Sequence, residues 1–124
     1  MKFTFEDLKE LMTYSEISAI KITEREPVYV NVLNNDRSEE NTKPLTNFPE
    51  LSRDEVTALI EGLKIELGIP GDQRIIDAEN KDGLRITVLW NESSDIPMIL
   101  ITRFVTLTKK TADFFPNQRL VLGN

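Results

Sequence analysis

The sequence predicts an α+β domain, in which a mostly antiparallel sheet of five to six strands carries two main helices on one face. Several segments alternate apolar and polar residues, which is typical of half-buried strands, and short polar turns separate them. Two other segments repeat apolar residues at helical spacing behind clear N-terminal caps. Hairpin-linked strands interrupted by single helices indicate this fold class, and 124 residues suffice for one domain, 1–124, with its own core.

The first helix is predicted near the start of the chain. Thr4 can act as its N-cap, and Asp7 completes a short capping box three residues later. The helix should end near residues 14–16 and bury a stripe of apolar side chains, namely Phe5, Leu8, Leu11 and Met12.

The second helix has stronger start and stop signals. Ser52 and Glu55 form a capping box, and Gly68 followed by Pro70 marks the end. Its buried stripe is predicted to be Val56, Leu59, Ile60, Leu63 and Leu67. Four polar side chains on the opposite side should face water: Thr57, Glu61, Lys64 and Glu66.

Strands are predicted at residues 18–23, 28–33, 74–79, 84–90 and 98–107. The last of these is apolar on both faces, which favours a central or doubly covered position in the sheet. Asp82 and Gly83 predict a hairpin turn between the third and fourth strands. A long mobile surface loop is expected at about 34–50, and the tail, 108–124, should dock or form a short edge strand.

The chain contains no histidine and no cysteine, the side chains that supply most neutral-pH general bases and soft metal ligands. The remaining residues form no recognisable catalytic, metal-binding or phosphate-binding pattern. Two carboxylate pairs, Asp54 with Glu55 and Glu92 with Asp95, are interpreted as solvated. We therefore expect a protein that is not an enzyme and uses no cofactor or metal.

Charge and hydropathy indicate which classes of partner the chain is unsuited to bind. The chain has 15 Lys and Arg against 21 Asp and Glu, which disfavours nucleic-acid binding. Its longest apolar run, around residues 98–101, is too short for membrane insertion, and the acidic first residues do not resemble a signal peptide. A cytoplasmic location and protein partners are expected, with a homodimer as one form.

The face of the sheet opposite the helices is the candidate interaction surface, because contiguous exposed apolar residues usually mark a partner site. One row of the last strand should lie on it, either Ile99, Ile101 and Val105 or Met98, Leu100 and Phe104. An equally weighted alternative is that Phe114, Phe115, Leu120 and Leu122 fold back to cover this face. The contact residues that we predict are Tyr29, Arg85, Leu89, Ile99, Ile101 and Arg103.

Apolar patterns in the chain resemble the N-terminal domain of PilT-like pilus-retraction and secretion ATPases. The similar segments are residues 5–12, 15–22, 27–32, 51–60, 83–88 and 97–103. The family's histidine in the first strand and its glycine after the second have no counterpart here, and the P-loop ATPase domain is absent. The resemblance implies a PAS-like module that mediates subunit contacts without catalysis.

The favoured function is therefore a protein-interaction or regulatory module, of a type IV pilus or secretion system if the resemblance holds. One alternative is a small acidic secretion chaperone, similar to the type III chaperones, that binds an effector segment. A second alternative is a small-ligand binder that uses Trp90 and the carboxylates.

Overall fold

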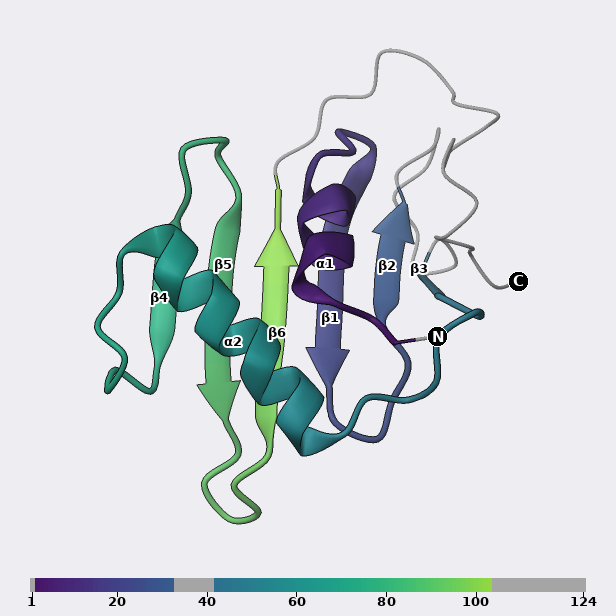
Figure 1. The fold of residues 1–124 in the computed structure, drawn as a ribbon. Helices are drawn as coiled ribbons and strands as arrows, with labels where there is room; N and C mark the ends of the chain where they lie inside the picture. Colours follow the sequence, from purple (N-terminus) through teal and green to yellow (C-terminus); the bar gives the residue numbers. More distant parts are fainter. Residues whose placement is uncertain (1, 33–41, 104–124) are drawn as a thin grey trace.

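The computed structural model describes residues 2–32 and 42–103. Six strands form one sheet in the order β3-β2-β1-β6-β5-β4, and every neighbouring pair is antiparallel. Both helices lie on the same face of this sheet, with α2 crossing it obliquely (Figure 1). The predicted α+β class is confirmed. The elements are α1 (Phe5–Met12), β1 (Ile17–Thr23), β2 (Tyr29–Val32), β3 (Thr42–Pro44), α2 (Arg53–Leu67), β4 (Ile76–Glu79), β5 (Arg85–Trp90) and β6 (Pro97–Thr102).

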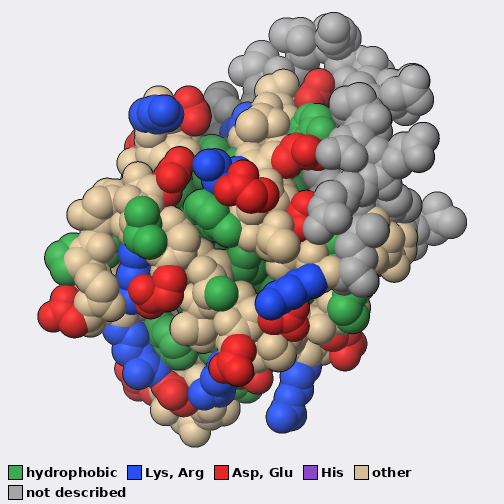
Figure 2. Space-filling model, viewed as in Figure 1, with side chains coloured by type: hydrophobic (Ala, Val, Ile, Leu, Met, Phe, Trp, Pro, Cys, Tyr) green, Lys and Arg blue, Asp and Glu red, His purple; other side chains and the backbone are tan. Residues whose placement is uncertain are grey.

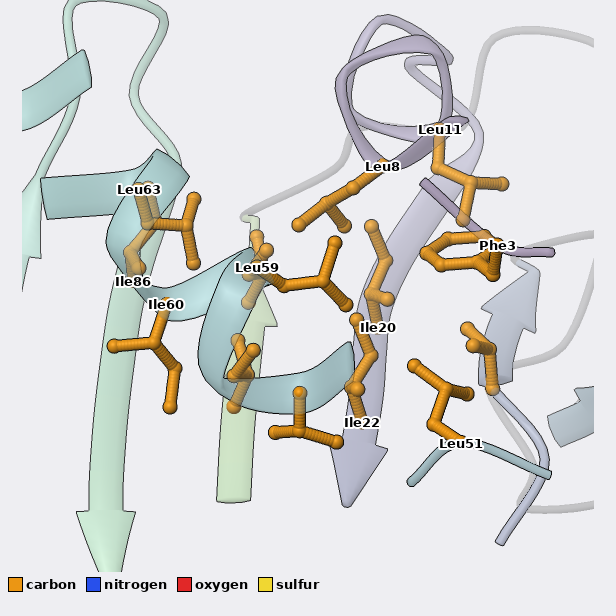
Figure 3. Close-up of a cluster of buried hydrophobic side chains, with 14 of the residues drawn as sticks. Phe3, Leu8, Leu11, Ile20, Ile22, Leu51, Leu59, Ile60, Leu63 and Ile86 are labelled. Atoms are coloured by element: carbon orange, nitrogen blue, oxygen red, sulfur yellow. The ribbon is translucent and has the colours of Figure 1, made fainter. Parts of the chain in front are cut away.

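The core lies between the helices and the inner face of the sheet, the face that the helices cover. β-branched side chains line up across the three central strands in two rows. One row is Ile20, Ile101 and Ile86, and the other is Ile22, Ile99 and Val88; all six are at most 1% exposed. Figure 3 shows side chains of α1 and α2 pointing toward these strands, among them Leu8, Leu11, Leu59, Ile60 and Leu63.

Both predicted helix starts are confirmed in atomic detail. The Thr4 hydroxyl accepts the N–H of Asp7, whose carboxylate accepts the Thr4 N–H at 2.8 Å. The same reciprocal pair joins Ser52 and Glu55 at the start of α2. At the other end of α2, Gly68 adopts the left-handed conformation (φ 69°), which glycine reaches without a steric penalty.

Replacing Glu55 with glutamine should make the free energy of unfolding depend less steeply on pH in the acid range. The Glu55 carboxylate accepts the backbone N–H of Ser52 at 2.9 Å, and this bond lowers the pKa of Glu55 below its ordinary value of 4.5. Because the folded pKa is the lower one, the charged carboxylate stabilises the fold above the unfolded pKa, and the contribution is lost as pH falls through the folded value. The glutamine amide oxygen can still accept the Ser52 N–H but carries no charge. Urea unfolding across the acid range should therefore show a loss of about 0.5 kcal/mol at neutral pH and a shallower slope.

Ser52→Ala is the matched control for this measurement. It removes the hydroxyl that accepts the Glu55 N–H at 3.2 Å but keeps the backbone N–H that binds the carboxylate. This variant should be less stable than the wild type at every pH and should keep most of the acid slope. A Glu55→Gln variant with the full wild-type slope would contradict the assignment.

Three expected boundaries and one expected exposure were wrong. α1 ends at Met12, with Thr13 as its C-cap, and not near residues 14–16. The predicted loop at 34–50 contains the edge strand β3, followed by Leu45 and Phe48, which are both buried; residues 34–41 lie outside the described part. β4 begins at Ile76 rather than at residue 74. The Lys64 side chain is buried, not solvent-facing, and its ammonium donates to the carbonyl oxygen of Gly71 at 2.9 Å.

The central position predicted for the last long strand is confirmed, since β6 pairs with β1 on one side and β5 on the other. β6 ends at Thr102 in the structure, and the predicted continuation through 104–107 lies outside the described residues. The same holds for the tail, 108–124, and for the aromatic and leucine residues that could have covered the sheet.

Candidate functional site

Neither helix covers the second face of the sheet, which we call the outer face (Figure 1). The strand register places alternate residues there in rows that run across the sheet. One row is Tyr29, Lys21, Leu100, Thr87 and Asp77, and the next contains Thr23, Met98 and Leu89. Leu89 is 44% exposed, a high value for a leucine in a strand.

The apolar part of the outer face extends toward the β4 edge. Leu89 pairs with Met98, and Ile75 directly precedes β4, whose first residue, Ile76, pairs with Val88 next to Leu89 in the chain. Ile75 is 61% exposed. At the opposite side, a shallow depression of about 460 Å³ lies next to Tyr29 and is lined by Ala19, Lys21, Glu26, Asn31 and Thr42. The outer face therefore combines exposed apolar side chains with a shallow depression that is lined mainly by polar residues.

Three of the six predicted contact residues lie on the outer face: Tyr29, Arg85 and Leu89. Ile99 and Ile101 do not, because both point into the core and are at most 1% exposed. The other row of β6, with Met98 and Leu100, occupies the outer face instead. The prediction failed here because a strand that is apolar on both faces does not show which row is inward; the pairing with β1 and β5 decides it.

Arg103 also lies away from the outer face. Its backbone N–H donates to the carbonyl oxygen of Ser18 at 2.9 Å. Its guanidinium donates to the carbonyl oxygen of Met12 at the end of α1. Burial lowers the pKa of Arg103, although the carboxylates of Asp82 and Glu16 act in the opposite direction. Arg103 therefore joins α1 to the sheet and belongs to the helix side of the molecule.

Arg85 is on the outer face but is already paired. Its guanidinium makes two hydrogen bonds to the Asp77 carboxylate, at 3.0 and 2.8 Å, and these bonds raise the pKa of Arg85. Both side chains are more than half exposed, so the pair contributes little to stability. It remains available to a partner as a neutral, planar, hydrogen-bonding unit.

The Trp90 side chain is held by its neighbours. Its indole N–H donates to the carbonyl oxygen of Arg74 at 2.9 Å, and the Arg74 guanidinium lies 4.1 Å from the ring centroid. Arg74 also forms an ion pair with Asp95, to which Arg53 approaches at 3.6 Å. Trp90 and Asp95 therefore belong to a packed surface cluster, which is not the arrangement of a ligand pocket with converging polar groups.

A second concave region lies on the helix side, and sequence reasoning did not find it. We call it the α1–hairpin groove, because α1, the end of α2 and the β4–β5 turn enclose it. It measures about 1340 Å³. Its residues come from four separate stretches of the chain, so no local motif marks it; an excess of exposed acids near α1 and α2 was the only sequence signal.

Within residues 2–32 and 42–103, no three acidic side chains are grouped closely enough to hold a metal ion. No helix in that part of the chain is both long and apolar enough to cross a membrane. A comparison with protein-family models found no match, and a comparison with curated proteins found none either.

Proposed function

We propose that the chain is a non-enzymatic protein-interaction module that pairs with a second copy of itself through the outer face. The observation that carries this proposal is an apolar group on a face that neither helix covers. Leu89 and Met98 pair across β5 and β6 in one row, and Leu100 follows two residues further along β6. Apolar side chains gathered on one face usually mark a partner surface. Two sheets can stack face to face, and a two-fold axis would bury the same group from both copies.

Charge supports a second copy as the occupant. The chain as a whole carries a formal charge of −6, which would repel a second copy at most orientations. On the outer face, however, the charged strand residues balance: Lys21 and Arg85 against Asp77 and Glu79. Repulsion between two copies is therefore weakest at the surface that carries the exposed Leu89 and the half-buried Met98 and Leu100.

The size of the face is also suitable. Six strands about 4.8 Å apart span roughly 24 Å, and six residues of strand are about 20 Å long. The projected area is about 480 Å², and the accessible area of a surface covered with side chains is larger. Standard interfaces bury about 800 Å² on each partner, so a specific dimer would use most of the outer face together with its rim.

The resemblance to the N-terminal domain of pilus and secretion ATPases adds a biological setting to this proposal. A module that makes contacts between subunits without catalysing a reaction is what that resemblance implies. We propose on this basis that the chain contributes contacts to a pilus or secretion assembly.

Light scattering and sedimentation equilibrium over a range of protein concentrations test the dimer. We expect the wild-type chain to dimerise and Leu89→Glu to raise the dissociation constant at least tenfold, because it places a charge in the apolar group of both copies. Ile65→Glu is the matched control: Ile65 is 81% exposed on α2, on the helix side, and its substitution should leave dimerisation unchanged. A wild-type chain that stays monomeric, or a dimer lost in Ile65→Glu but kept in Leu89→Glu, would reject the proposal.

A further inference from the structure

The α1–hairpin groove has an apolar floor. Phe5 and Met12 from α1 and Leu67 from α2 are only partly buried there, above the fully buried Leu63 and Ile86. Phe5 can lie low in the groove because it packs directly on Gly62 of α2, where a side chain would collide with the ring. An apolar side chain of a partner could pack on these partly exposed residues and bury the apolar area that they still expose.

The rim of this groove is predominantly acidic. Six carboxylate side chains line it, against three cationic ones, which gives the groove about half of the chain's formal charge of −6. Figure 2 shows acidic side chains gathered around hydrophobic ones near α1 and the end of α2. The acidic residues are Glu6, Asp7, Glu10, Glu66, Glu79 and Asp82.

The cationic side chains in the groove are partly engaged by the protein itself. Arg103 donates to the Met12 carbonyl oxygen and lies in the field of Asp82. The Lys9 ammonium is 5.8 Å from the centroid of the Phe5 ring. Lys81 is exposed, and with it the six acidic and three cationic side chains leave the rim with a net negative charge. A groove with low-dielectric walls concentrates the resulting potential.

We propose that the α1–hairpin groove binds a basic amphipathic peptide segment of a partner protein. Apolar side chains of the segment would pack on Phe5, Met12 and Leu67, and its lysines or arginines would face the rim. The groove is larger and more open than the pockets of about 300–1,000 Å³ that enclose small ligands. Its charge would repel a nucleic acid and attract a basic segment.

This groove lies on the helix side and the dimerisation surface lies on the outer face, so the two proposals can fail separately. A Leu89→Glu chain that has lost dimerisation should still bind the basic segment. A chain whose groove is altered should still dimerise.

Fluorescence anisotropy with a designed probe tests the groove. The probe is a labelled peptide of lysine and leucine at helical spacing, titrated with the full chain; a scrambled peptide of the same composition and a glutamate–leucine peptide are controls. We expect saturable binding of the amphipathic basic probe that weakens as salt is added. Neither control peptide should bind within tenfold of that affinity.

Two double charge-reversal variants, one in the groove and one outside it, test where the probe binds. Glu6→Lys with Glu66→Lys changes the rim at two exposed positions on the helices, and we expect at least a tenfold loss of affinity for the probe. Glu92→Lys with Asp72→Lys makes the same change in net charge at exposed positions outside the groove and should alter affinity less than threefold. Equal losses in both double variants, equal binding of the scrambled peptide, or no saturable binding of the basic probe would overturn the proposal.

Discussion

Ile99→Ala is expected to lower the free energy of unfolding by about 3–4 kcal/mol. Ile99 lies in the centre of the sheet, pairs with Ile22 on one side and Val88 on the other, and is fully buried beneath α2. The substitution leaves a cavity where three strands meet, and well-packed neighbours can only partly close it. Since small domains are stable by about 5–15 kcal/mol, urea unfolding should show a large shift of the midpoint.

Leu89→Ala is the control for this prediction because Leu89 lies on the neighbouring strand but faces outward. It is 44% exposed, so truncation removes little buried surface and should cost less than about 1 kcal/mol in the monomer. Measurements below the dissociation constant of the dimer keep the two effects separate. If Ile99→Ala were as mild as Leu89→Ala, the assignment of Ile99 to the core would be wrong.

Gly62→Ala is expected to destabilise the wild-type chain by about 1 kcal/mol, although alanine is the better helix former. A Cβ at this position would lie 2.7 Å from Cδ1 and 2.8 Å from Cγ of Phe5, so the ring must move. Overpacking of this kind costs about 1–3 kcal/mol, which exceeds the gain of about 1 kcal/mol in helix propensity.

The sign of this effect should reverse when Phe5 is removed. In a Phe5→Ala background the clash is absent, and Gly62→Ala should stabilise the helix by about 0.5–1 kcal/mol. The coupling energy from the double-mutant cycle is therefore about 2 kcal/mol. Additive effects of the two substitutions would mean that Phe5 does not rest on Gly62, and the floor of the α1–hairpin groove would have to be redrawn.

Local signals in the sequence predicted most of the secondary structure. The capping boxes at Thr4 and Ser52 and the stop at Gly68 place both helices, because these bonds form within four residues. The β4–β5 turn follows from Asp82 and Gly83 for the same reason. The edge strand β3 was missed because its three residues, Thr42–Pro44, carry no alternation and are held only by pairing with β2.

The composition of the outer face was predictable only in part. Alternation in the strands correctly placed Tyr29, Arg85 and Leu89 opposite the helices. For Ile99 and Ile101 the pattern was uninformative, since both rows of β6 are apolar. The α1–hairpin groove was not predictable at all, because α1, α2 and the β4–β5 turn meet only after the sheet has formed.

By itself, the sequence determined both helix starts, the end of α2, the hairpin, the α+β class and the absence of histidine and cysteine chemistry, all of which depend on residue type and short-range spacing. The tertiary structure alone decided which row of β6 is buried, that Lys64 is buried and donates to the Gly71 carbonyl oxygen, and which carboxylates share a rim. Those features depend on which neighbour a side chain meets across the fold. Strand pairing and helix packing over long sequence separations determine that neighbour, and no local pattern encodes it.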